Sequence, residues 1–204
     1  FPKLRELHRR RYGNPDLDEQ TALNTEVGLR MYLASGLASD FSIYHSTVAG
    51  LIERPDRQST YLNLDEVVFK GFEAETGGWL TDKDYFSFAW SYLDAQEDQP
   101  EAESRQLRSR PKHTLTAEYR RHLSRGIEFS LNSIYLKGLY DLDADGVYTE
   151  ISPFFVANLK IETSFSVHAS IYVAIANLLD ENYQHRLGFP REGRSVQAGL
   201  TFAL

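Results

Sequence analysis

The stretch RSVQAGLTFAL (residues 194–204) alternates between apolar side chains and small or polar ones. Its alternating apolar positions are Val196, Ala198, Leu200, Phe202 and Leu204. A period of two residues predicts a β-strand with one apolar face and one polar face. The stretch alone leaves open whether its apolar face contacts a protein core or lipid.

The same alternation recurs along the chain and predicts nine strands. Two of them, near 38–51 and 64–80, are less regular than the others. The regular ones cover 23–33, 86–92, 113–120, 127–133, 157–161, 167–175 and 196–204. Only the arginine-rich start of the chain could form a helix, of one or two turns.

The predicted connections alternate between short and long. The short ones lie near 34–37, 80–84, 122–126 and 164–166. The long, polar ones cover 1–20, 52–63, 94–112, 141–152 and 179–193. Sequential antiparallel strands with short turns at one end and long loops at the other are typical of an up-and-down transmembrane β-barrel. We therefore predict an all-β fold that forms part of a larger barrel.

The two faces of the predicted strands differ in chemistry. The polar face carries the charged residues Glu26, Arg30, Glu118, Arg120, Glu128, Lys160 and Glu162. We expect aromatic residues near strand ends of the apolar face, as an interfacial girdle requires: Trp79, Trp90, Tyr92, Tyr119 and Phe202. In a barrel the polar face lines a wet lumen and the apolar face contacts lipid. In the alternative, a soluble all-β module that binds carbohydrate or lipid, the apolar face packs inward.

Composition excludes several classes of function. The net charge of −7 argues against a nucleic-acid partner, because the chain has no overall basic field. The chain has no cysteine, so disulfides and thiolate metal sites are unavailable. No Gly-x-Ser-x-Gly, His-Glu-x-x-His or phosphate-binding glycine loop occurs, so we predict a non-enzyme. A β-rich hydrolase with paired acids is the remaining catalytic alternative.

Three stretches carry a family resemblance. The first is FPKLRELHRRRYGNPDL, with Pro2, Leu4, Glu6 and Leu7 followed by Gly13, Asn14, Pro15, Asp16 and Leu17. The second is IANLLDENYQ, with Asn177, Leu178, Leu179, Asp180 and Tyr183. The third is the terminal strand after PREGRS. In this order and spacing, residues 1–204 resemble the C-terminal portion of the β-barrel of TonB-dependent outer-membrane receptors.

The resemblance implies a location in the bacterial outer membrane and a role in TonB-dependent uptake of a metal chelate. A ferric siderophore is the foremost expectation, with cobalamin and haem as alternatives. Receptors of this family have 22 strands around an N-terminal plug that carries the TonB box, so the plug and TonB box are absent from these 204 residues. The expected partners are the chelate, outer-membrane lipid and lipopolysaccharide, TonB through the missing plug, and the barrel assembly machinery. The five long segments would be extracellular.

The terminal strand also resembles the assembly signal of outer-membrane barrels. The residues that fill this signal are Gln197, Gly199, Phe202 and Leu204. The usual last residue is Phe, and Leu204 departs from it.

The densest positive cluster is a candidate ligand-binding lip, formed by Arg5, His8, Arg9, Arg10, Arg11 and Tyr12. Arginine pairs well with carboxylate or catecholate oxygens, and ferric siderophores are often anionic. A solvated loop, or contacts with anionic lipopolysaccharide, is the alternative. His8 also lies between Phe1-Pro2 and the Asn14–Leu17 box, an arrangement similar to that of haem receptors.

Two further loops carry candidate sites. DLDADG (141–146) resembles the start of a calcium loop, with Asp141, Asp143 and Asp145 as ligands and Gly146 at the turn. Position twelve holds Ser152 instead of the expected Glu, so an acidic turn without Ca²⁺ is the alternative. The charged loop from Glu97 to Arg110 is either solvated or a lid over the ligand. We expect no resident cofactor.

Overall fold

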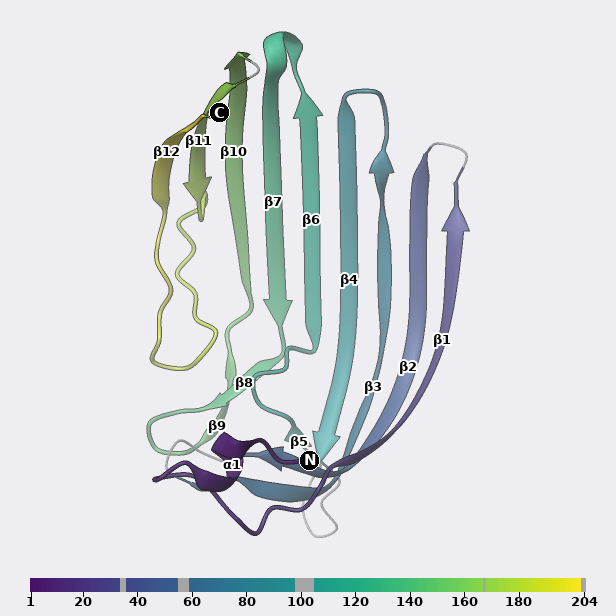
Figure 1. Ribbon diagram of the computed structural model, residues 1–204, viewed down its shortest axis with the longest axis vertical. Helices are drawn as coiled ribbons and strands as arrows, with labels where there is room; N and C mark the ends of the chain where they lie inside the picture. Colours follow the sequence, from purple (N-terminus) through teal and green to yellow (C-terminus); the bar gives the residue numbers. More distant parts are fainter. Residues whose placement is uncertain (34–35, 55–58, 98–104, 167, 203–204) are drawn as a thin grey trace.

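The computed structural model describes residues 1–33, 36–54, 59–97, 105–166 and 168–202. One antiparallel sheet dominates it, and Figure 1 shows its strands side by side. The order along the sheet is β1-β2-β3-β4-β6-β7-β10-β11-β12, with β5 paired to β4. The strands are β1 (Thr21–Tyr32), β2 (Leu37–Glu53), β3 (Leu62–Trp79), β4 (Asp84–Glu97), β5 (Arg105–Gln106), β6 (His113–His122), β7 (Ile127–Lys137), β10 (Phe154–Ser166), β11 (Ala169–Ala176) and β12 (Ser195–Phe202).

All nine expected strands are present, and they follow one another in sequence order. The structure adds the two-residue β5, within the expected loop 94–112, and a separate hairpin of β8 (Leu139–Leu142) and β9 (Tyr148–Ile151), which overlaps the expected loop 141–152. These elements are too short for a period of two residues to be recognised in the sequence.

The helical content is as small as expected. The described helices are α1 (Leu4–His8) and a 3₁₀ turn at Ser124–Gly126. None of the helices in the described ranges has the length and apolar character needed to cross a bilayer.

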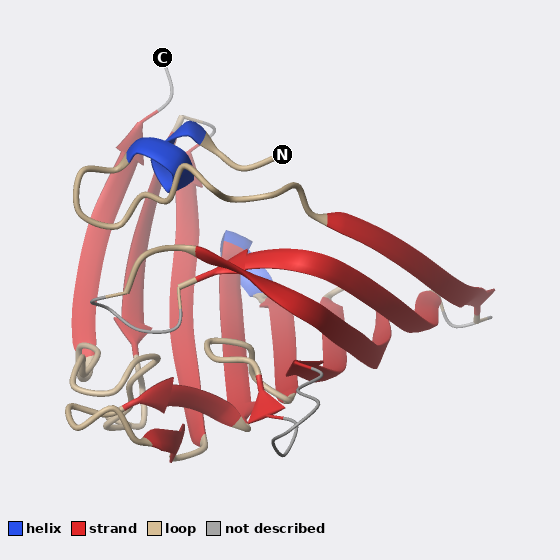
Figure 2. Cartoon of the chain, turned by 90° about the horizontal axis from the view of Figure 1, so that it is seen from below, coloured by secondary structure: helices blue, strands red, loops and turns tan. Residues whose placement is uncertain are grey.

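The sheet is curved, and Figure 2 shows it as an open arc rather than a closed cylinder. Within the described residues β1 and β12 are its edges and pair on one side only. The short connections lie at one end, which we call the turn end, together with the end of β12 (Figure 1). The long connections, α1 and the β8–β9 hairpin lie at the other end, the loop end. The expected sorting of loop lengths is therefore confirmed, and the sheet is part of a barrel.

Strand register gathers the apolar residues on the convex face. One row of cross-strand partners runs Phe86, Tyr119, Leu131, Leu159, Ile175 and Val196. Nothing in the described chain covers this face: Val196 is 66% exposed, Leu200 59% and Phe202 68%. The soluble module, whose apolar face would pack inward, is therefore wrong for this chain.

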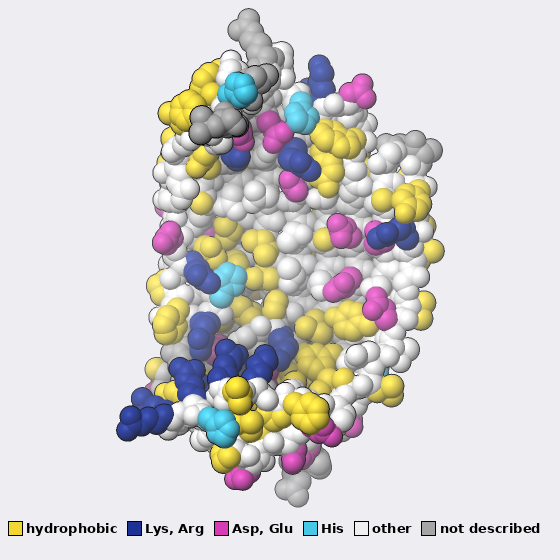
Figure 3. Space-filling model, viewed as in Figure 1, with side chains coloured by type: hydrophobic (Ala, Val, Ile, Leu, Met, Phe, Trp, Pro, Cys, Tyr) yellow, Lys and Arg dark blue, Asp and Glu magenta, His cyan; other side chains and the backbone are white. Residues whose placement is uncertain are grey.

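The seven predicted charged residues lie on the concave face, which Figure 3 views directly. Several pair with a neighbour there. Arg30 Nε lies 2.5 Å from Asp40 Oδ1 on the next strand, and Lys160 Nζ lies 2.5 Å from Glu162 Oε2. Charges and hydrogen-bonding groups on this side are typical of a wet barrel lumen.

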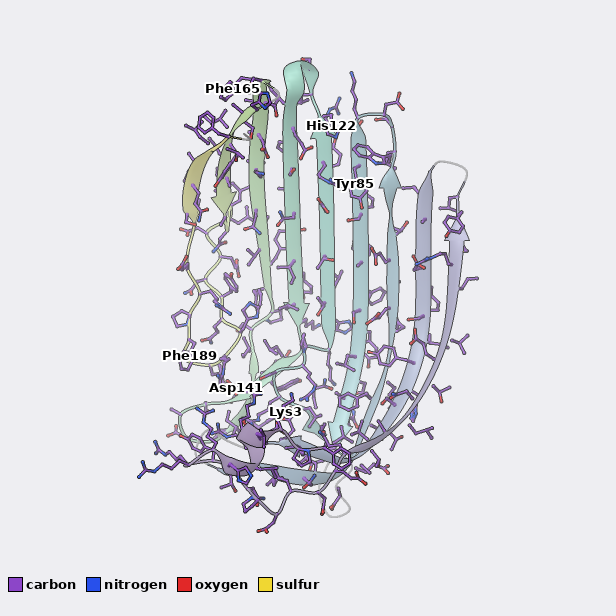
Figure 4. All side chains as sticks on the ribbon, viewed as in Figure 1. Lys3, Tyr85, His122, Asp141, Phe165 and Phe189 are labelled. Atoms are coloured by element: carbon purple, nitrogen blue, oxygen red, sulfur yellow. The ribbon has the colours of Figure 1, made fainter. Side chains whose placement is uncertain are left out.

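Trp79 corrects one sequence expectation. It lies opposite Tyr85 in the register and stacks on His122, with ring centroids 5.4 Å apart, so it faces the lumen rather than lipid. Figure 4 labels Tyr85 and His122 near the turn end of the sheet. The sequence could not assign this face because Gly77 and Gly78, which precede Trp79, have no side chains to continue the alternation. Trp90, Tyr92, Tyr119 and Phe202 do lie on the convex face.

The terminal strand shows why a glycine occupies position 199. A Cβ added there would lie 2.4 Å from the Cε1 atom of Tyr172, whose ring covers the glycine from the neighbouring strand. Gln197 and Gly199 belong to the concave face and Phe202 to the convex face. Leu204, the last residue of the predicted assembly signal, lies outside the described residues.

The two faces of β11 allow a matched test. In the full-length protein we expect Val173→Arg, on the lipid side, to lower the free energy of unfolding by about 2–4 kcal/mol, because the charge loses water near the bilayer centre. Ala174→Arg, one residue away on the lumen side, is the control and should cost much less. Urea unfolding in lipid vesicles measures both. Equal losses would contradict the assignment of the faces.

Candidate ligand-binding site at the loop end

The concave face becomes apolar near the loop end, where two loops fold back onto it. Leu107 packs there with Val67 and Ala95, against strands β3 and β4. Tyr183, from the segment between β11 and β12, packs on Leu136, Phe154 and Val156. Burial of these side chains fixes both loops against the wall.

Asp141 connects three loops. It is on β8, and only 5% of its side chain is exposed. Its Oδ1 atom lies 3.7 Å from Arg108 Nη1, in the β4–β6 connection. Its Oδ2 atom accepts a hydrogen bond of 3.2 Å from the backbone N–H of Leu187, in the β11–β12 connection. Figure 4 shows Asp141 at this end of the sheet. A buried carboxylate needs such partners, so the three loops depend on one another.

A cavity of about 370 Å³ opens between these loops, and we call it the arginine pocket. Its lining residues are Glu53, Arg108, Ser109, Arg110, Asp141 and Arg186. Arg110 Nη2 lies 2.5 Å from Glu53 Oε1, and Arg108 donates to the carbonyl oxygen of Arg54. Figure 3 shows Lys and Arg side chains gathered at this end of the concave face.

Gln106 anchors the segment that carries Arg108 and Arg110. Its Oε1 atom accepts a hydrogen bond of 3.2 Å from the backbone N–H of Ala95, and its Nε2 atom donates to the carbonyl oxygen of Arg110 at 3.3 Å. Its own carbonyl oxygen accepts from the hydroxyl of Tyr148 on β9. Gln106 is buried, so these bonds form away from competing water.

The N-terminal segment is built around a compact corner. Glu6, which is buried, accepts a 2.9 Å hydrogen bond from the backbone N–H of Lys3, as in a capping box. The side-chain amide of Asn14 donates to the carbonyl oxygen of Tyr61 at 2.9 Å and ties the corner to the residue before β3. A Cβ on Gly13 would lie 2.5 Å from the backbone N of Arg9, so only glycine fits.

The residues of the predicted lip are accessible. Arg5, His8, Arg9, Arg10 and Arg11 are exposed, and Tyr12 is half-buried. The Tyr12 ring gathers cations: Arg54 lies 4.0 Å from its centroid, Arg9 5.6 Å and Arg11 5.5 Å. Because the carbonyl of Arg54 also accepts from Arg108, Arg54 connects the lip with the arginine pocket.

The predicted calcium ligands do not converge. Asp143 Oδ1 accepts from the backbone N–H groups of Asp145 and Val147, at 2.9 and 2.8 Å, and closes a turn at Gly146. Asp141 is directed to Arg108 and Leu187 instead. Within the described residues, no three acidic or histidine side chains are grouped as metal ligands. A calcium site in this loop stays a prediction.

Residues 2–178 match the family described as TonB dependent receptor-like, beta-barrel. The match covers most of the chain and includes the strands from β1 to β11, but not β12 or most of the β11–β12 loop. The chain belongs to this family.

Its relatives agree with this assignment. The iron-regulated outer membrane virulence protein of Vibrio cholerae is 26% identical over 94% of this chain and 32% of its own length. The copper transporter OprC superposes on 99% of this chain and 35% of its own, with a TM-score of 0.76 and 15% identity. The ferric-catecholate import receptor Fiu of E. coli K12 covers 92% of this chain and 28% of its own, with a TM-score of 0.72 and 17% identity. At these identities the two structures show the fold alone.

Membership of the TonB-dependent receptor family fixes the setting. The chain lies in the bacterial outer membrane, and its family is one of receptors and transporters rather than of enzymes. It spans about a third of the length of the curated relatives it matches.

The second receptor-like stretch has a structural role. Asn177 is buried and has a positive φ of 50°, which Asn tolerates better than most residues. Its side chain donates to the carbonyl oxygens of Glu181 and Glu192, at 2.9 and 3.3 Å, and accepts from the N–H of Glu181 at 2.8 Å. Asp180 Oδ1 accepts from the N–H of Arg194 at 2.7 Å. The motif therefore closes the long β11–β12 loop at its base.

Sequence reasoning missed part of the arginine pocket. Arg108 and Arg110 belong to the charged loop expected as a possible lid, of which residues 98–104 lie outside the described residues. Glu53 and Arg186 carried no signal, because they lie far apart in the sequence and only the fold brings them together.

Asn177→Ala tests the loop base. We expect a loss of about 1–3 kcal/mol, because the backbone groups of Glu181 and Glu192 lose their partners and alanine disfavours a positive φ. Hydrogen exchange of residues 177–194 in the full-length receptor measures local opening. Asn182→Ala, at an exposed neighbour, is the control and should change little. Unchanged protection in Asn177→Ala would refute this role.

His185 should make the same loop sensitive to acid. Burial, and secondarily the charge of Arg191, hold the pKa of His185 below its ordinary value of 6.5. As the pH falls, the unfolded loop therefore binds a proton at a higher pH than the folded loop does. The stability of the folded loop is fully present above pH 6.5 and decreases as the pH falls from 6.5 towards the lowered pKa. Hydrogen exchange against pH should show this loss, and His185→Phe should remove it. A loop equally protected across that range contradicts the prediction.

Proposed function

We propose that this chain supplies barrel wall and ligand-capturing loops to a receptor that takes up a metal chelate with energy from TonB. A ferric siderophore is the preferred ligand class. One observation carries the proposal. The chain forms a barrel wall of this family, and many arginines lie at its loop end, next to the face that lines the lumen. Anionic chelates suit such a surface, because guanidinium groups bind paired oxygens.

The names of similar proteins support iron as the metal. The curated relative from Vibrio cholerae is named as iron-regulated. Similar solved structures include a ferric-catecholate import receptor and the ferripyoverdine receptor of Pseudomonas aeruginosa. The copper transporter OprC shares the fold, so the fold alone does not select the metal.

The proposed sequence of events has three steps. The loop end faces the outside of the cell, and its loops capture the chelate. A plug in the full-length receptor then rearranges when TonB pulls on it. The chelate finally passes along the polar concave face towards the periplasm. The arginine lip can also contact lipopolysaccharide, and the terminal strand serves barrel assembly.

Uptake by cells tests the proposal. Iron-limited cells that lack the gene should fail to accumulate radiolabelled iron from one chelate of a panel, and the full-length gene should restore uptake. Removal of TonB should abolish uptake as well. If every chelate, including those of cobalt and copper, is taken up equally with and without the gene, the proposal is refuted.

The lip has its own test. A triple variant should weaken binding of an anionic ferric chelate by on the order of tenfold, because capture loses its electrostatic attraction. It combines Arg9→Gln, Arg10→Gln and Arg11→Gln. Added salt should weaken the wild type similarly. Lys83→Gln, which removes a charge at the opposite turn end, is the control. If the variant binds the chelate with the affinity and salt dependence of the wild type, the lip is a solvated loop without a role in capture.

A further inference from the structure

The arginine pocket has a charge that suits one kind of occupant. Its described lining carries three guanidinium groups (Arg108, Arg110, Arg186) and two carboxylates (Glu53, Asp141), so its formal charge is 3 − 2 = +1. A single negative charge neutralises this site. The two carboxylates of the lining would repel a doubly charged phosphate, and the three arginines would repel a metal cation.

The pairing inside the pocket leaves one arginine uncommitted. Glu53 pairs with Arg110, and Asp141 with Arg108. Within the described ranges, Arg186 forms no ion pair, and its guanidinium stacks over the Phe189 ring at 5.7 Å. Arg186 is also exposed, so its donors can reach a ligand that enters from the lumen.

Hydrogen bonds between the loops fix the shape of the pocket. Asp141 accepts from the N–H of Leu187, the residue next to Arg186, and so fixes the backbone that carries the uncommitted arginine. The N–H of Ser109 donates to the carbonyl oxygen of Tyr140 at 3.1 Å and fixes the backbone between Arg108 and Arg110. A site ordered in advance loses less conformational entropy on binding.

We propose that the arginine pocket is a preformed subsite for one singly charged oxyanion, a carboxylate or ionised phenol group of the transported chelate. Arg186 binds the oxyanion, and Arg108 and Arg110 add donors. Asp141 is a positioning residue that orients Arg108 and the loop of Arg186. Glu53 and Asp141 together exclude multiply charged anions. The identity of the ligand rests on the proposed function, whereas the preference for a single charge rests on the pocket alone.

The test uses purified full-length receptor and 4-fluorobenzoate, a small carboxylate observed by fluorine NMR. We expect saturable binding that Arg186→Gln weakens roughly tenfold or more, since a charge-assisted pair is lost. Arg186→Lys should recover part of the affinity, because it keeps the charge and loses the planar fork. Arg191→Gln removes a charge from the same loop outside the pocket and should leave binding unchanged.

Replacing either carboxylate tests which anions the pocket accepts. A purely structural role of Asp141 or Glu53 would leave this selectivity unchanged. Asp141→Asn raises the pocket charge to 3 − 1 = +2 and keeps an oxygen that can accept from Leu187. Inorganic phosphate should then displace 4-fluorobenzoate, which it should fail to do in the wild type. Glu53→Gln should produce the same change and guards against local loosening in Asp141→Asn.

The outcomes separate the two proposals. If fluorobenzoate binds as predicted but no chelate is transported, the subsite stands and the proposed function fails. If Arg186→Gln binds fluorobenzoate as tightly as the wild type, or if phosphate displaces it from the wild type, the subsite proposal is overturned. Chelate uptake with no fluorobenzoate binding overturns the subsite and leaves the proposed function intact.

Discussion

A strand in lipid must have its backbone hydrogen bonds satisfied by other strands, and the rest of this structure follows from that constraint. Each interior strand of the sheet pairs with neighbours on both sides, over long registers. Pairing fixes which side chains point outward, so the apolar residues of nine strands form continuous rows on the convex face. Among the described residues, β1 and β12 each pair on one side only, as expected for a sheet that forms part of a larger barrel.

Because lipid occupies one face, the chain builds its small hydrophobic clusters on the other. Both lie at the loop end of the concave face, where loops fold back onto the wall. This arrangement gives the loops fixed positions without a conventional core. It also explains why Asp141 and Asn177, both buried polar residues, have several partners each: they connect loop backbone where few apolar contacts are available.

The positive charge of the loop end has two parts with different physical character. The lip of the N-terminal segment is exposed, and water and salt screen its arginines. The arginine pocket is more enclosed and has carboxylates in fixed positions beside its arginines. The first suits long-range attraction of an anion and the second suits discrimination between anions, and Arg54 contacts both.

The nine long strands, their order, the sorting of loops and the family could be predicted from the sequence, because in a strand that crosses a bilayer successive side chains alternate between lipid and the lumen. The sequence did not predict the face on which Trp79 lies, because the glycines before it, Gly77 and Gly78, interrupt the alternation of side chains. It singled out Asp141 as one ligand of a candidate Ca²⁺ loop, and the contact of this carboxylate with Arg108 could not be read from local spacing, because Arg108 lies in another loop. Only the tertiary structure brought Glu53, Arg108 and Arg186 together, because residues far apart in the chain meet through strand register and loop packing, which no local pattern encodes.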